Sequence, residues 1–115
     1  MEIENIKFKA KQLNSEKWFE GDLVRLGNRV CIGGDHIKDG ITDVDPSTVC
    51  MFTGLKDKNG TPIYEGDIVM HKDNNAERRG DINWDSKSTA FCFGQDFLVH
   101  YPSEDMVVVG NKFDK

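Results

Sequence analysis

Apolar and polar residues alternate over short segments along most of the chain, which predicts β-strands rather than helices. Residues 6–10 (IKFKA) place apolar side chains between lysines, as in a strand with one buried face. Residues 13–17 are typical of a turn, and residues 18–26 predict a second strand with a bulge at Gly21. The two strands are therefore expected to pair as a β-hairpin.

The second half of the chain continues with short strands joined by tight turns. Apolar residues recur at every second position in several of them, as expected of strands that bury one face. A nearly continuous apolar run near the end is typical of a central strand. The strands are expected at residues 68–71, 81–85, 89–94 and 97–101, with the central strand at 106–113 and a less regular strand within 27–40. Several short strands at this spacing favour a small barrel.

One helical turn is expected between the two halves. Asp45 is a suitable N-cap, and Pro46 fits the first helical position, where its missing N–H costs nothing. Residues 47–50 would form the turn, and Val49, Met51 and Phe52 would face the core. No helical period follows, so a longer helix is not expected.

Residues 53–69 (TGLKDKNGTPIYEGDIV) are the richest in turn-forming residues. Asn59-Gly60 tolerates positive φ at both central positions of a turn, and Asp57 can accept hydrogen bonds from the turn backbone. Pro62 favours an extended conformation before it, and Gly66 lies in a second corner. The segment predicts a tight loop, a short edge strand, a corner and then a core strand.

Composition supports a single small, β-rich protein. The chain has 115 residues, with nine Val and eight Ile against three Ala and five Leu, and β-branched residues favour pleated sheets. The pattern divides it into a β-rich N-terminal extension, residues 1–45, and a barrel, residues 46–115. Three scattered cysteines give no disulfide framework, and neither a leader nor a membrane span is evident, which favours the cytoplasm.

Several of these segments together resemble the YopX family, small proteins of phages and bacterial prophages. The resemblance is carried by IKFKA, Trp18, VDPSTVCMFTGLKDKNGTPIYEGDIV, GDINW and VVVGNKF. It implies an SH3-type β-barrel in the C-terminal half with a β-rich N-terminal part, in a bacterial host cell. The resemblance implies no catalytic residues. The motif positions, which we interpret as mainly structural, are Thr53, Gly54, Asp57, Asn59, Gly60, Tyr64, Glu65, Gly66 and Asp67.

Candidate catalytic and metal-binding patterns are weak. The loop from Asp57 places its glycine at the fourth position, whereas an EF-hand needs glycine at the sixth. The histidines lie far apart, which disfavours zinc, and no phosphate-binding loop follows the paired glycines. Glu65 and Asp67 could act as paired carboxylates, but turn carboxylates more often accept backbone N–H bonds. We therefore predict a protein that is not an enzyme and uses no cofactor.

One segment suggests a partner. The polar loop 71–80 and its neighbours supply Lys72, Arg78, Arg79 and Trp84, and basic groups beside aromatic rings can bind nucleic acid. The net charge of −5 argues against a general nucleic-acid binder. The prediction is therefore a module that binds a protein partner, with nucleic-acid binding as the alternative and self-association left open.

Overall fold

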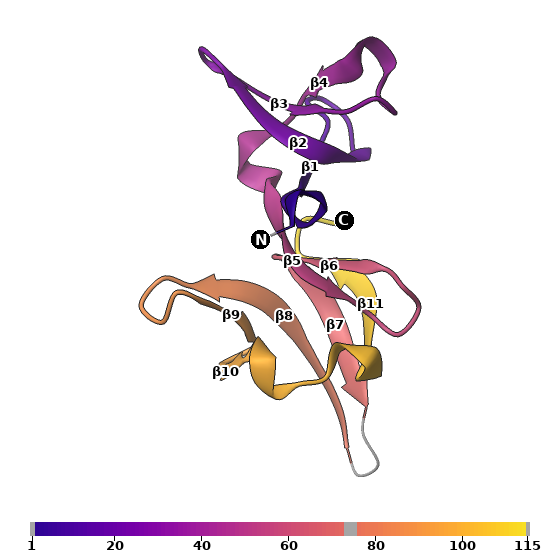
Figure 1. Ribbon diagram of the computed structural model, residues 1–115, viewed down its shortest axis with the longest axis vertical. Helices are drawn as coiled ribbons and strands as arrows, with labels where there is room; N and C mark the ends of the chain where they lie inside the picture. Colours follow the sequence, from indigo (N-terminus) through magenta and orange to yellow (C-terminus); the bar gives the residue numbers. More distant parts are fainter. Residues whose placement is uncertain (1, 73–75, 115) are drawn as a thin grey trace. The chain divides into compact units, whose positions relative to one another are not determined.

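The computed structural model describes residues 2–72 and 76–114 and is built of β-strands and short 3₁₀ turns, with no α-helix in these ranges (Figure 1). The mainly β class predicted from the sequence is confirmed. The chain forms two compact units, Met1–Phe52 and Thr53–Lys115. The division into folding domains at residues 45 and 46 stays a prediction.

The first unit is an antiparallel sheet in the order β4-β3-β2-β1-β5. The predicted hairpin is confirmed, because β1 pairs with β2 and β2 spans the residues expected. The strands are β1 (Phe8–Lys11), β2 (Trp18–Leu26), β3 (Arg29–Gly33), β4 (Ile41–Asp43) and the start of β5 (Cys50–Lys56), with 3₁₀ turns η1 (Ile3–Asn5), η2 (Lys38–Gly40) and η3 (Pro46–Thr48).

Alternation along β1 decides what this sheet buries. Phe8 and Ala10 face the core of the first unit, whose fully buried members include Ile32. Lys9 and Lys11, at the alternate positions of β1, face the other way, and their ammonium groups lie 5.0 and 5.6 Å from the Trp18 ring centre. The period of two read from the sequence thus separates an apolar face from a basic one.

The predicted turn at Asp45 is confirmed. The Asp45 carboxylate accepts a hydrogen bond from the backbone N–H of Ser47 at 3.0 Å, and Pro46 occupies the first position of η3. The turn is of the 3₁₀ type and spans Pro46–Thr48, so Cys50, which was expected within it, begins β5 instead. Phe52 is buried as expected, but Met51 is exposed, because successive residues of β5 point to opposite faces.

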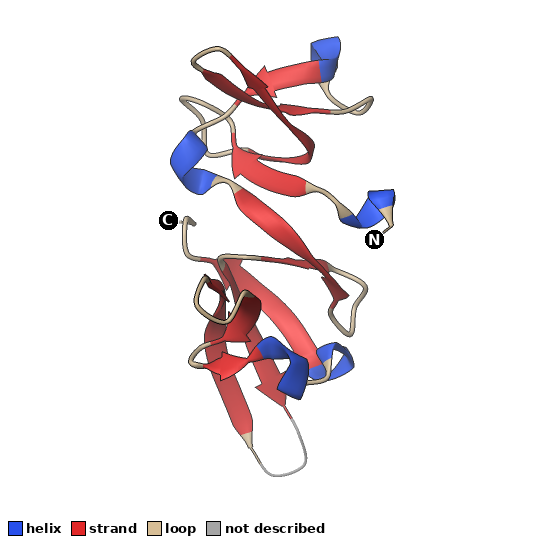
Figure 2. Ribbon diagram, turned by 60° about the vertical axis from the view of Figure 1, so that its left-hand side comes forward, coloured by secondary structure: helices blue, strands red, loops and turns tan. Residues whose placement is uncertain are grey.

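The second unit contains an antiparallel sheet in the order β10-β9-β8-β7-β11, with β5 and β6 as a further neighbouring pair (Figure 2). Its core centres on Phe93, Ile82 and Met106. Its elements are the rest of β5, β6 (Pro62–Tyr64), β7 (Asp67–Lys72), β8 (Glu77–Asp85), β9 (Ala90–Phe93), β10 (Asp96–Phe97), η4 (Leu98–His100), η5 (Ser103–Asp105) and β11 (Met106–Asn111). The described strands do not form a closed ring of pairings, so a closed barrel is not observed.

Two strand predictions are wrong. The strand expected at 97–101 ends after Phe97, and a 3₁₀ turn follows that buries Leu98 and exposes Val99. The run expected as a central strand is β11, at the edge of its sheet. Its outer side is covered, because the backbone of Val108 donates to Asp57 and Lys58 donates to the carbonyl of Met106. This cover explains how an apolar run is tolerated at an edge.

The polar loop expected at 71–80 is mainly strand. β7 continues to Lys72 and β8 begins at Glu77, four residues before the predicted strand. Residues 73–75 lie outside the described part. The backbone pairing of Lys72 with Glu77 therefore overrides the polar composition that suggested a loop.

The turn-rich segment is held by two buried carboxylates. Asp57 accepts hydrogen bonds from the backbone N–H of Asn59, Thr61 and Val108, each at 2.9 Å. Burial alone would raise the pKa of Asp57, but the three N–H donors together outweigh it and leave that pKa below its ordinary value. At the second corner, Asp67 is fully buried and accepts from the backbone N–H of Tyr64.

Candidate interaction surface

The four residues proposed as a binding surface do not lie together. Along β7 and β8, Arg79 pairs with Met70 and Arg78 pairs with His71, so the two arginines point to opposite faces of the sheet. Trp84 shares the face of Arg78, whereas Lys72 shares the face of Arg79. From the sequence we predict that these four side chains form one basic and aromatic surface. Alternation along the strands instead divides them into two pairs, on opposite faces of the sheet.

Arg78 is already engaged within the second unit. Its Nη1 donates to Asp96 Oδ2 and to the Tyr101 hydroxyl, both at 2.6 Å, and the hydroxyl donates to Asp96 at 2.7 Å. The guanidinium also lies over the rings of Phe93 and Tyr101, 5.2 and 5.4 Å from their centres. Arg78 therefore fastens parts of this unit together.

The electrostatics of this cluster follow from its hydrogen bonds. The bond from Tyr101, and then that from Arg78, lowers the pKa of Asp96. The bond to Asp96, followed by desolvation, raises the pKa of Tyr101, and the bond to the same carboxylate raises the pKa of Arg78. The cluster thus holds a carboxylate, a guanidinium and a neutral phenol near neutral pH.

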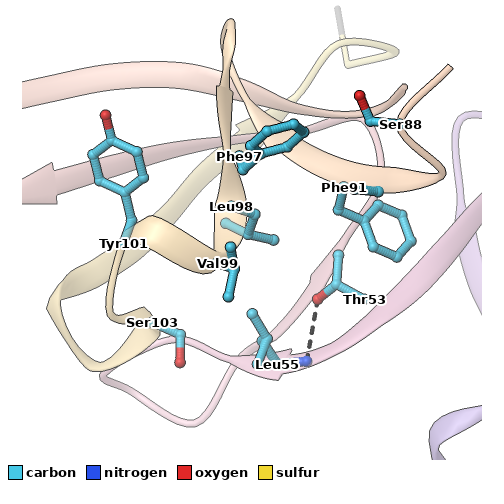
Figure 3. A pocket seen from close by; sticks show the side chains of 10 residues that line it. Thr53, Leu55, Ser88, Phe91, Phe97, Leu98, Val99, Tyr101 and Ser103 are labelled. Atoms are coloured by element: carbon cyan, nitrogen blue, oxygen red, sulfur yellow. Dashed lines mark hydrogen bonds between the residues drawn. The ribbon is translucent and has the colours of Figure 1, made fainter. Parts of the chain in front are cut away.

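An apolar pocket of about 550 Å³ lies beside this cluster in the second unit (Figure 3). Its walls come from β5, from β9 with the turn before it, and from the segment that follows β10. The residues that line it are Thr53, Leu55, Ser88, Ala90, Phe91, Phe97, Leu98, Val99, Tyr101 and Ser103. A pocket of this size is within the range that accepts a small ligand or a few side chains.

Unusually exposed apolar side chains surround the pocket. Val99 is 85% exposed, Phe97 40% and Leu55 36%. Trp84, 46% exposed, packs edge-on against the Phe91 ring at 5.1 Å between centres. Val99 is exposed because η4 turns the chain away from the sheet after only two residues of β10. Several exposed apolar side chains around one hollow are typical of a binding surface, whereas single ones are not.

The polar groups of the pocket walls are largely occupied. The Thr53 hydroxyl donates to the Ile63 carbonyl, the Ser88 hydroxyl donates to Asp85, and the Tyr101 hydroxyl donates to Asp96. These groups have limited capacity to recognise a polar ligand. The pocket is therefore suited to an apolar group, which gains free energy when it leaves water.

Sequence inspection missed most of the pocket. Among the motif positions only Thr53 lines it; Gly60 and Gly66 have positive φ in turns, Gly54 has positive φ within β5, and Tyr64 is buried. The sequence feature that marks this wall of the pocket is the run of three apolar residues at 97–99, followed by Pro102. An apolar run alone does not distinguish a strand from a turn, so the pattern predicts a strand where the structure has the turn η4. Within the described residues no group of three or more His, Cys, Asp or Glu could hold a metal ion.

The fold and the pocket define a small, mainly β protein with an apolar surface pocket. The chain belongs to the YopX family: the family model, described as YopX protein, matches residues 2–115. This match confirms the resemblance found in the sequence. No curated protein matches the chain. None of the helices in the described part is both long enough and apolar enough to cross a bilayer.

Proposed function

We propose that this YopX protein is an accessory protein of a phage or prophage that binds a protein partner through the pocket of its second unit. The observation that carries the proposal is the hollow of about 550 Å³ with exposed Val99, Phe97 and Leu55 around it. The partner would place apolar side chains among them. The bacterial cytoplasm is the proposed site of action.

The pocket suits a protein partner because its chemistry matches the centre of protein interfaces. Such centres are apolar, contain aromatic residues and exclude water, while polar groups surround them. Phe91, Phe97 and Tyr101 supply the aromatic part, and Arg78 and Asp96 lie beside Tyr101 at the edge. A few buried apolar side chains at about 25 cal/mol per Å² can dominate the affinity of such an interface.

A role without catalysis is part of the proposal. The sequence raises the question of calcium binding at the Asp57 loop and of paired carboxylates at Glu65 and Asp67. Of these residues, Asp57 and Asp67 accept hydrogen bonds from the backbone of their own turns. A carboxylate used in this way is committed to the fold. The resemblance also led us to expect an SH3-type barrel, which we retain as a proposal supported by the antiparallel sheet of short strands. Self-association is likewise retained.

The proposal predicts that Val99→Asp removes partner binding while the fold remains intact. The charge would enter an apolar interface without an opposite charge, whereas Val99 is 85% exposed in the free protein and contributes little to its core. The matched control is Val109→Asp, at an exposed valine of β11 that does not line the pocket. Tagged wild-type, Val99→Asp and Val109→Asp proteins are compared in pull-downs from phage-infected or prophage-induced cells by quantitative mass spectrometry.

We expect one or more proteins to be retained by wild type and Val109→Asp and reduced at least about tenfold with Val99→Asp, since hot-spot changes exceed about 1.4 kcal/mol. Equal capture by all three proteins would contradict the pocket as the binding site. Fluorescence anisotropy with single- and double-stranded DNA and RNA tests the alternative. Saturable, salt-dependent binding that is lost on changing Lys72 and Arg79 to Glu would replace the protein partner with nucleic acid.

A further inference from the structure

One wall of the pocket is a short segment that has little regular structure to hold it. We call residues Phe97–Tyr101 the strap. The strap supplies Phe97, Leu98, Val99 and Tyr101 to the pocket lining. Figure 3 shows Phe97, Leu98 and Val99 on the side of the strap that faces Leu55 and Phe91. Pairing of β10 with β9 covers only Asp96 and Phe97, so the sheet holds the strap at its beginning only.

Within the strap, two interactions hold the middle. Leu98 is 4% exposed and belongs to the core cluster with Phe93, while the backbone N–H of Tyr101 donates to the Leu98 carbonyl at 3.0 Å. The far end of the strap, at Tyr101, is held by contacts between aromatic rings. The Tyr101 ring packs edge-on against Phe93 and His71, at 5.0 and 5.2 Å between ring centres.

The Tyr101 hydroxyl connects this far end back to the beginning of the strap. It donates to Asp96, the residue just before the strap, at 2.7 Å. Arg78, from the neighbouring part of β8, donates to both of them and covers the faces of Phe93 and Tyr101. Asp96 and Tyr101 are thus tied together across the base of the strap, and Arg78 ties both to the sheet.

We infer that Arg78 and Asp96 are positioning residues that fix the strap and thereby set the shape of the apolar pocket. Neither residue lines the pocket; both act through Tyr101, which does. The consequence for partner binding rests on the proposed function. The statement that Arg78 and Asp96 hold the strap in place does not. It also gives Arg78 a role different from the nucleic-acid binding considered for it from the sequence.

The hydrogen-bonded cluster is suited to a strap that can open. The side chains of Arg78 and Asp96 are about half exposed, and exposed ion pairs add only a small amount of free energy because water competes with them. Removing one member should therefore increase local opening without unfolding the sheet. Local opening of this kind is measured by backbone amide hydrogen exchange.

The test compares Arg78→Met and Tyr101→Phe with wild type by hydrogen exchange at pH 7. Methionine keeps an apolar contact over the rings, and phenylalanine keeps the ring of Tyr101 without its hydroxyl. We expect the strap amides, including that of residue 101, to exchange about threefold to tenfold faster in each variant. The amide of Gly66, which donates to the Ile82 carbonyl at 2.6 Å in the corner before β7, should not change. The matched control is Arg79→Met, on the opposite face of β8.

The double variant separates positioning from independent packing effects. If the residues act as one unit, Arg78→Met combined with Tyr101→Phe should speed strap exchange little more than either change alone. Unchanged strap exchange in both single variants would overturn the inference, and so would equal acceleration of the Gly66 amide. Loss of the proposed partner leaves this comparison intact, since exchange is measured on the free protein. Failure of the binding proposal and failure of the positioning inference are therefore distinguishable.

Discussion

Replacing Asp67 with alanine is expected to destabilise the second unit by about 3 to 4 kcal/mol, because it leaves buried donors without acceptors. Asp67 is fully buried, and its two oxygens accept from the backbone N–H of Tyr64 at 2.8 Å and from the Asn111 side-chain amide at 3.0 Å. Both donors belong to buried residues, Tyr64 and Asn111, so bulk water is a poor substitute for the lost carboxylate. The change therefore removes two hydrogen bonds and also opens a small cavity.

This prediction is measured by urea unfolding in a Trp18→Phe background. The chain has two tryptophans, and this change leaves Trp84, which lies in the second unit, as the reporter. The matched control is Asp105→Ala, at an exposed position of η5, which should change stability by less than about 0.5 kcal/mol. An Asp67→Ala protein within about 1 kcal/mol of the control would show that the corner does not depend on this carboxylate.

Replacing Gly21 with alanine is expected to destabilise the first unit by about 3 kcal/mol, which combines backbone strain and overpacking. Gly21 has a φ of +155°, and a Cβ there would lie 2.2 Å from the Gly33 carbonyl oxygen on the neighbouring strand. The backbone of one of the two strands would therefore have to move to make room for the alanine Cβ. The registers of β2 with β1 and with β3 contain no shift, so Gly21 is not the bulge predicted from the sequence; it is a point of close strand approach.

The control for Gly21 is Gly27→Ala in the turn between β2 and β3. Gly27 has a φ of +58°, but a Cβ there meets nothing within 4 Å, so only the backbone penalty of about 1 kcal/mol applies. Unfolding is followed through Trp18 in a Trp84→Phe background. Equal losses of stability in the two variants would mean that the Gly33 carbonyl moves aside easily and that close approach is not what selects glycine.

The turn-rich segment shows how far local sequence rules extend. Asp57, Gly60 and Pro62 predict turns from their own backbone preferences, and the structure has a turn at 58–60 followed by the short edge strand β6. Local rules did not show that Asp57 also accepts the backbone N–H of Val108, which is 51 residues away. The turn therefore covers the open side of β11, and only the tertiary structure shows that contact.

Four features follow from side-chain period, local capping and motif spacing, which can be read along the chain. They are the mainly β class, the first hairpin, the capped turn at Asp45 and the family. The sequence also predicts which side chains share a face of one strand, such as Ile82 and Trp84. In the structure, β9 places Phe93 and Phe91 opposite these two residues.

The choice of neighbouring strands, and the places where apolar residues remain exposed, depend on how distant parts of the chain pack. The run at 97–99 satisfies the apolar pattern of a strand, yet pairing ends after Phe97, and the next residues turn Leu98 into the core and Val99 toward solvent. Likewise, Arg78 and Arg79 are equivalent as charges in the sequence, but strand register directs one toward Asp96 and the other to the opposite face. Pairing between distant segments fixes these outcomes, and a local pattern carries no information about a distant partner.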